Sequence, residues 1–172
     1  MCDLNPHVKL AILAIEGYVR TGCTIEVPGD TPEELLSTKA GAFVCIKIDG
    51  ELRGCIGTIE PIQENLAREI VENAISAATM DPRFTCVQVE ELEFLEFSVD
   101  VLSPRELVTD IRELDPKRYG VVVENGPRKG LLLPDLDGID SVEEQIDIAK
   151  HKAFIKTTEP IKLYRFEVKR YQ

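Results

Sequence analysis

At 172 residues, with 44% apolar and 30% charged side chains, the chain has the length and composition of one globular domain, and a domain of this length buries roughly 70% of its unfolded surface. No apolar run approaches the roughly 20 residues that cross a bilayer, and Met1 to Pro6 lacks the regions of a signal peptide, so we expect one cytoplasmic domain over residues 1–172. The formal charge of −11 would repel a phosphate backbone, and nucleic-acid binding is therefore not expected.

Two helices are predicted before the first strand. Asn5 is a good N-cap and Pro6 suits the first helical position, so the first helix begins there and ends before Gly22. Its apolar residues form one stripe that should dock on a sheet: Val8, Ile12, Ile15 and Val19. Thr31 is the expected cap of a short second helix that ends near Leu36.

A β-hairpin follows, with strands over residues 42–48 and 51–58. Asp49-Gly50 between two β-type runs is the strongest short-range signal for a two-residue hairpin turn. In the register of that turn, Cys45 faces Gly54 and Val44 faces Cys55. Cys45 and Cys55 then point to opposite faces, so a disulfide between them is disfavoured.

The second strand of this hairpin divides its side chains between two faces. Strand alternation places Arg53, Cys55 and Gly57 on one face and leaves Leu52, Gly54 and Ile56 on the other. Arg53 and Cys55 would be neighbours about 7 Å apart along the strand.

The rest of the chain alternates helices with paired strands. A helix is predicted over 62–80 and ends at Asp81-Pro82, since proline cannot continue it. A strand over 95–101, a hairpin of 119–123 with 130–133, a helix over 141–154 opened by Ser141, and a strand over 163–168 follow. Strands that arrive as hairpins indicate an α+β fold with a mixed or mainly antiparallel sheet and flanking helices.

Cys55 is the first candidate for chemistry, because a neighbouring guanidinium favours the reactive thiolate and Gly54 and Gly57 would keep the backbone accessible to a ligand. The alternative is a small buried hydrophobe. Arg53 is suited to binding a carboxylate or phosphate bidentately, or equally to an ion pair with Glu51 or Glu60.

Asp81 and Arg83 fit the rim of a cleft, or a helix stop with a surface ion pair. His7 is expected to face solvent, and His151 is the only other base candidate for Cys55, although a surface position is the simpler expectation. Arg128 and Lys129 form a basic hairpin tip that could meet an acidic partner.

No metal or cofactor is predicted. Five cysteines, an odd number without a C-x-x-C pair, argue against a disulfide scaffold, and two isolated histidines argue against a zinc site. The chain has neither a Walker loop nor a G-x-G-x-x-G turn.

These residues together resemble the AMMECR domain family, also called protein A of the AmmeMemoRadiSam gene system. The segments that carry the resemblance are Gly41-Ala42-Phe43-Val44, Leu52-Arg53-Gly54-Cys55-Ile56-Gly57-Thr58, Asp81-Pro82-Arg83-Phe84, Val101-Leu102-Ser103-Pro104, Tyr119-Gly120-Val121-Val122-Val123 and Arg128-Lys129-Gly130-Leu131-Leu132-Leu133-Pro134. One departure is Phe154, where relatives usually have glycine, so the helix before it loses its glycine cap.

The resemblance implies two lobes forming a cleft, with Leu52–Gly57 facing that cleft. It also implies genetic association with a Memo-like protein and a radical S-adenosylmethionine protein, but no settled activity. The motif positions that carry over are predicted to bind substrate: Leu52, Gly54, Ile56, Gly57, Asp81 and Arg83.

The leading hypothesis is a thiol-dependent enzyme or accessory protein that acts on a small anionic molecule or a partner peptide. Cys55 is the predicted nucleophile, Arg53 orients the anionic group, and Asp81 or His151 transfers protons. The alternative is a non-catalytic protein-interaction module. No oligomeric state follows from the sequence.

Overall fold

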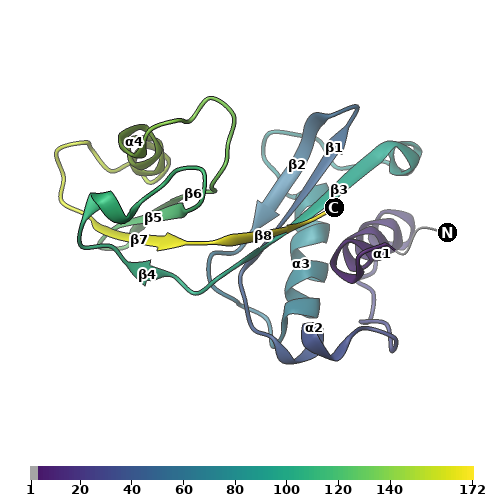
Figure 1. Cartoon of the computed structure of the whole chain (residues 1–172). Coiled ribbons are helices and arrows are strands. Elements are labelled where there is room, and N and C mark those ends of the chain that lie inside the picture. Colours follow the sequence, from purple (N-terminus) through teal and green to yellow (C-terminus); the bar gives the residue numbers. More distant parts are fainter. Residues whose placement is uncertain (1–3) are drawn as a thin grey trace. The chain divides into compact units, whose positions relative to one another are not determined.

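The chain forms two compact units in the computed structural model, which describes residues 4–172 (Figure 1). The first unit runs to Val101 and also contains Lys169–Gln172, and the second is Leu102–Val168. Two units agree with the expected two lobes, while a cleft between them stays a prediction, as does a single domain over residues 1–172. The segment Met1 to Asp3, on which the signal-peptide argument partly rests, and Cys2 lie outside the described residues.

The first unit is built on a four-stranded sheet in the order β2-β1-β3-β8. Its strands are β1 (Ala42–Ile48), β2 (Glu51–Gly57), β3 (Leu95–Leu102) and β8 (Val168–Tyr171). β1 pairs antiparallel with both β2 and β3, so β2 is an edge strand.

Three helices belong to this unit, namely α1 (Pro6–Thr21), α2 (Glu33–Ser37) and α3 (Leu66–Thr79), with a 3-10 helix η1 (Val89–Phe94). α3 packs on β1 and β2, and α1 packs on α3. The contact is closed by fully buried side chains from all three layers: Ile15, Val44, Ile46, Ile70 and Ala74. Each buried valine or isoleucine contributes about 1.5–3 kcal/mol.

The helix ends follow their capping residues. The Oδ1 of Asn5 accepts from the backbone N–H of His7, and Gly22 ends α1 in the left-handed region at φ 73°, as expected. The predicted start of α3 at residue 62 is wrong, because Asn65 caps the N–H of Arg68 and the helix begins after it. Thr31 is not the cap of α2, whose N-cap position is Pro32.

The second unit has its own sheet, in the order β4-β7-β5-β6. The elements are β4 (Glu106–Leu107), η2 (Ile111–Glu113), β5 (Gly120–Asn125), β6 (Arg128–Leu132), α4 (Val142–Lys152) and β7 (Lys162–Phe166). Ser141 caps α4, which packs on β5 and β6 around Val121, Val123 and Ala149. Antiparallel ladders with flanking helices confirm the α+β class.

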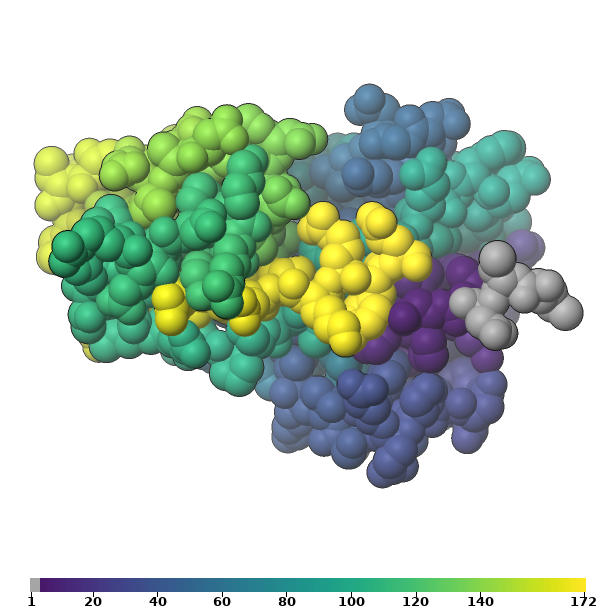
Figure 2. Space-filling model, viewed as in Figure 1, coloured from purple at the N-terminus to yellow at the C-terminus, as the bar shows by residue number. Residues whose placement is uncertain are grey.

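Within the first unit, the C-terminal strand contacts the N-terminal helix. The rings of His7 on α1 and Tyr171 on β8 stack with centroids 3.7 Å apart and an interplanar angle of 9°. In Figure 2 the yellow C-terminal segment accordingly lies against the purple helix. His7 is buried, so the expectation that it faces solvent is wrong: a residue far along the chain covers it.

Candidate functional site

The candidate site centres on the β1–β2 hairpin, whose register differs from the predicted one. Asp49-Gly50 makes the turn, and Ile48 pairs with Glu51 as expected. A bulge follows, because Lys47 pairs with Leu52 whereas Ile46 pairs with Gly54. Arg53 is the extra residue, and it shifts the remainder of β2 by one position.

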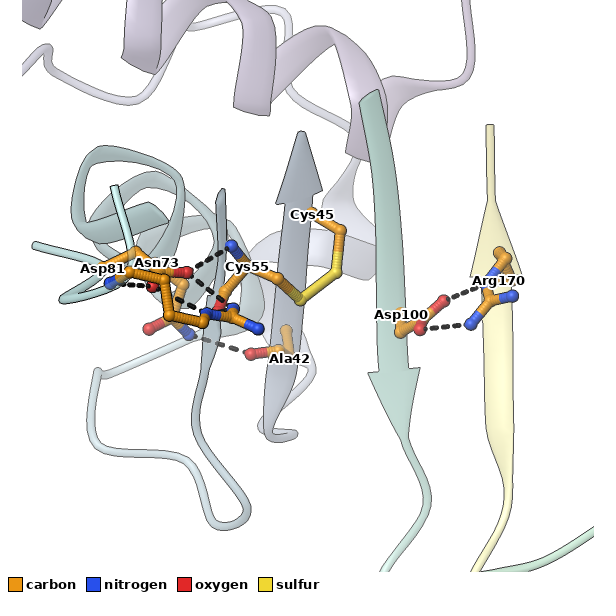
Figure 3. Close-up of a disulfide and its surroundings, with 8 residues drawn as sticks. Ala42, Cys45, Cys55, Asn73, Asp81, Asp100 and Arg170 are labelled. Atoms are coloured by element: carbon orange, nitrogen blue, oxygen red, sulfur yellow. Dashed lines mark hydrogen bonds and ion pairs between the residues drawn. A yellow bond between two sulfur atoms is a disulfide. The ribbon is translucent and has the colours of Figure 1, made fainter. Parts of the chain in front are cut away.

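The bulge places Cys55 directly opposite Cys45, and the two are joined by a disulfide (Figure 3). Their sulfur atoms are 2.04 Å apart and their Cα atoms 4.0 Å apart. The prediction that these cysteines point to opposite faces is therefore wrong, since it assumed an uninterrupted ladder. Cys23 and Cys86 are free and exposed.

Gly54 and Gly57 are sites of close packing. A Cβ at Gly54 would overlap the carbonyl oxygen of Ala77 on α3, and one at Gly57 would overlap the ring of Phe43 on β1. Gly54 therefore lets β2 lie directly on α3, and Ile56 packs into the same core. On the same strand Leu52 is exposed.

Arg53 has a partner that the sequence did not indicate. Its Nε and Nη2 donate to the two carboxylate oxygens of Glu91 on η1, at 2.7 and 3.0 Å, and its Nη1 donates to the carbonyl of Thr85 at 2.9 Å. The hydrogen bond from Arg53 lowers the pKa of Glu91. The Arg53 side chain is 14% exposed, so the expected pairing with Glu51 or Glu60 gives way to a half-buried bidentate pair.

Asp81, which Figure 3 shows beside Cys55, and Arg83 both bind the backbone of Cys55. The N–H of Cys55 donates to Oδ2 of Asp81 at 2.9 Å, and Nη2 of Arg83 donates to the Cys55 carbonyl at 3.5 Å. The Arg83 guanidinium also holds both oxygens of Asp81, with Nε at 2.9 Å and Nη2 at 2.7 Å. These two side chains therefore satisfy the outward backbone groups of an edge strand.

The two members of this ion pair differ strongly in their exposure to solvent. The Asp81 side chain is 2% exposed and that of Arg83 is 55% exposed. The hydrogen bond from Arg83 holds the pKa of the Asp81 carboxyl far below its ordinary value, against the effect of burial, and the same contact raises the pKa of Arg83. Asp81 is thus ionised and buried. The expected ion pair with Arg83 is present, but only Arg83 lies at the surface.

Phe84 connects the two arginines. The guanidinium carbons of Arg53 and Arg83 lie 5.9 and 5.5 Å from the centroid of its ring. The structure thus brings together Arg53, Cys55, Asp81 and Arg83, and adds Cys45, Phe84 and Glu91, which the sequence reasoning missed. A glycine inside a strand was the one local signal for the bulge that brings in Cys45.

β3 and β8, the two strands of this sheet that lie farther from β2, carry a second polar pair. Arg170 on β8 donates from Nε and Nη2 to the two oxygens of Asp100 on β3, at 2.7 and 2.8 Å (Figure 3). Across the β1–β3 ladder, Cys45 pairs with Ser98. The buried Asn73 on α3 donates a hydrogen bond to the backbone carbonyl of Ala42 on β1.

The remaining candidates have other surroundings. His151 is exposed on α4 in the second unit, where it lines a surface groove of about 1030 Å³ with Asp147 and Lys156. At the basic hairpin tip, Arg128 pairs with Glu159 and Lys129 with Glu124.

Within residues 4–172, no group of three or more His, Cys, Asp or Glu side chains is placed to hold a metal ion. Nor does any helix there have the length and apolar character needed to cross a membrane.

Comparison with known proteins identifies the family. The model described as AMMECR1 matches residues 8–171. A protein of Thermotoga maritima is 56% identical over 174 residues, covering 100% of both chains. A protein of Clostridium acetobutylicum is 48% identical over 99% of this chain, which spans 36% of that protein. The structure of an uncharacterized protein from Pyrococcus horikoshii matches with a TM-score of 0.88 at 38% identity, covering 95% of this chain and 88% of that one. The chain belongs to the AMMECR1 family.

Proposed function

We propose that this protein is thiol-dependent, with Cys55 as its reacting residue and a small anionic molecule or a partner peptide as its substrate. The observation that carries the proposal is the support given to Cys55: Asp81 and Arg83 hold both of its backbone groups, while its side chain is half-buried on an edge strand. Once the Cys45–Cys55 disulfide is reduced, Cys55 combines the fixed backbone and the partly exposed position that a nucleophile needs.

The roles of the two arginines follow from their partners. Arg53 uses its Nε, Nη1 and Nη2 on Glu91 and Thr85, so its proposed part is to fix the bulge that orients Cys55. Arg83 is 55% exposed and lies against the Cys55 carbonyl, which makes it the group proposed to orient an anionic substrate. A cytoplasmic role beside a Memo-like protein and a radical S-adenosylmethionine protein is part of the same proposal, based on the resemblance.

Alkylation of the reduced protein tests the reactivity of Cys55. Native protein with its disulfide reduced is labelled with iodoacetamide at about pH 7 and each cysteine is followed by peptide mass spectrometry. Cys86, free and exposed, is the internal control. We expect Cys55 to be labelled faster than Cys86 in the native protein and at an equal rate in urea. Labelling of Cys55 slower than that of Cys86 in the native state would contradict the proposal.

The alternative of a non-catalytic interaction module is supported by one observation, which is that Arg53 and Asp81 both have internal partners. A partner that co-purifies equally well with the wild type and with Cys55→Ser would favour this alternative. Loss of the partner from Cys55→Ser alone would favour the thiol-dependent function.

A further inference from the structure

Cys45, which no sequence argument placed in the site, is bonded to Cys55. Cys45 and Cys55 are opposite each other in the β1–β2 ladder, with Cα atoms 4.0 Å apart and ten residues apart in sequence. Both side chains are half-buried. The two sulfurs therefore form one chemical unit at the surface of the sheet.

This disulfide joins strands that hydrogen bonds already hold together. A cross-link stabilises mainly by constraining the unfolded chain, and it does so less when it closes a short loop, as this one does. β1 is already hydrogen-bonded to β2 on one side and to β3 on the other. The bond thus joins two strands that are fixed without it, which is unlike the placement of a purely structural cross-link.

The two sulfurs differ in their access. Cys55 belongs to the edge strand β2, whereas Cys45 belongs to β1 and has neighbours on both sides, Cys55 and Ser98. The other face of β2 is covered by α3, where Gly54 meets Ala77. Among the residues that the structure describes, no further strand lies beyond β2, and the half-exposed Arg83 borders Cys55 on that side, so an incoming thiolate reaches the sulfur of Cys55 more readily than that of Cys45.

The contacts that hold the backbone of Cys55 do not depend on the disulfide. Its N–H is held by the buried Asp81 and its carbonyl by Arg83, and neither contact involves the sulfur. The exposed Lys47 lies on the face of Cys45 two residues along β1, opposite Glu96 of β3. Two thiols held this close can form their bond again without any rearrangement of the sheet.

We propose, on the basis of the thiol-dependent function above, that Cys45 and Cys55 are a reversible dithiol–disulfide pair that exchanges with a dithiol substrate. One substrate thiolate attacks the sulfur of Cys55; a substrate–Cys55 disulfide forms, the Cys45–Cys55 bond breaks, and Cys45 leaves as a thiolate that takes a proton from water. The second substrate thiolate attacks the first substrate sulfur and releases Cys55. The substrate loses two electrons and becomes a disulfide, and the protein gains two electrons and two protons. A low-molecular-weight disulfide reverses the change.

The test uses the full chain with dithiothreitol as the dithiol, reduced glutathione as the monothiol and glutathione disulfide as the oxidant. After each incubation the thiols are alkylated and the state of every cysteine is read by peptide mass spectrometry. We expect the pair to open in native protein and to close again with glutathione disulfide, and the exposed-cysteine control Cys86→Ser to behave in the same way. A pair that opens only under conditions that unfold the protein would overturn the inference and identify a structural cross-link.

Single-cysteine variants identify the attacked sulfur. With glutathione disulfide, Cys45→Ser should carry at least about tenfold more glutathione on Cys55 than Cys55→Ser carries on Cys45. Equal adducts would overturn the assigned order of attack. If Cys55 of Cys45→Ser reacts rapidly with iodoacetamide while the wild-type pair does not exchange, the inference fails and the proposed function stands. If Cys55 is inert in both, the proposed function fails as well. Circular dichroism checks that each variant is folded.

Discussion

The backbone N–H of Cys55 donates a hydrogen bond to the carboxylate of Asp81, 2.9 Å away and 26 residues later in the chain. Asp81 follows α3, and its side chain is buried at 2% exposure beside the edge of β2. Arg83 compensates the charge of this buried carboxylate, so Asp81 can remain ionised while it accepts the hydrogen bond from the outward N–H of Cys55. The conformation of the hairpin at Cys55 therefore depends on Asp81.

Asp81→Asn tests the role of this carboxylate. The asparagine keeps an oxygen for the Cys55 N–H but loses the ion pair with Arg83. Solvent screens that pair on the side of Arg83, which is half exposed. We expect the free energy of unfolding to fall by about 2 kcal/mol in urea denaturation. Asp110→Asn is the matched control, since Asp110 holds the main chain and guanidinium of Arg112 in the same way but at the surface. Equal losses in both variants would contradict the anchoring role of Asp81.

The same carboxylate predicts a dependence of stability on pH. The pKa of Asp81 in the folded chain lies far below its ordinary value of 3.8, so the unfolded chain binds this proton first as the pH falls. Its contribution is complete well above pH 3.8 and is lost as the pH falls through 3.8 toward the lowered pKa. Urea midpoints measured from about pH 6 to about pH 2.5 should fall more steeply for the wild type than for Asp81→Asn. Parallel curves would exclude Asp81 as the source.

The hairpin shows what local sequence can predict and what it cannot. Asp49-Gly50 specified the turn, and the pairing of Ile48 with Glu51 followed from it. The bulge at Arg53 was missed because an inserted residue leaves the apolar pattern almost unchanged, and its cause is tertiary: Glu91, 38 residues away, binds the arginine that is pushed out of the ladder.

Other misses have the same physical origin. His7 looked solvent-facing in the first turn of a helix, but Tyr171 at the other end of the chain covers it. β4 and β8 have two and four residues, which is too short for a periodic pattern to be recognised. The regular apolar spacing of α1 and α3 located both helices, but it did not give the start of α3, and it placed Ile12 and Val19 on the buried face of α1, where they are only partly buried.

Gly54→Ala tests the contact between β2 and α3. The new Cβ would overlap the backbone oxygen of Ala77, and a backbone atom on a packed helix cannot move aside easily. We expect a loss of about 2–4 kcal/mol in the free energy of unfolding. Gly29→Ala is the control, because no atom lies within 4 Å of its Cβ position, and it should change stability by less than about 0.5 kcal/mol. A harmless Gly54→Ala would show that α3 does not pack on Gly54.

Phe154→Gly is expected to stabilise the protein. Phe154 follows α4 with φ 56°, a left-handed conformation that costs an L-residue about 1–2 kcal/mol, and its side chain is 88% exposed, so little packing would be lost. Because glycine also loses more backbone entropy on folding, the net gain should be about 0.5–1 kcal/mol in the free energy of unfolding. Phe154→Ala keeps a Cβ in the same conformation and should show no such gain. A gain of equal size in both variants would point to the removal of an exposed ring instead of backbone relief.

The last expectation concerns His7, whose burial lowers its pKa below 6.5, with Lys169 acting in the same direction and Glu34 against it. At neutral pH the folded and unfolded chains both carry a neutral ring, so there is no effect there. Below pH 6.5 the unfolded chain binds the proton first, and stability should decrease as the pH falls from 6.5 toward the lowered pKa.

His7→Phe separates this titration from the contact that buries the ring. Phenylalanine keeps an aromatic ring for Tyr171 but cannot take up a proton, and it loses the contact of Nδ1 with Oδ1 of Asn5, which should cost about 1 kcal/mol at neutral pH. Thermal unfolding at pH 7.5 and pH 5.5, both in the same salt, should show a smaller drop for His7→Phe than for the wild type. His151→Gln, at an exposed position on α4, should retain the full drop. If His151→Gln and not His7→Phe flattened the curve, the titration would belong to the second unit, and the stacked pair that joins α1 to β8 would be insensitive to pH.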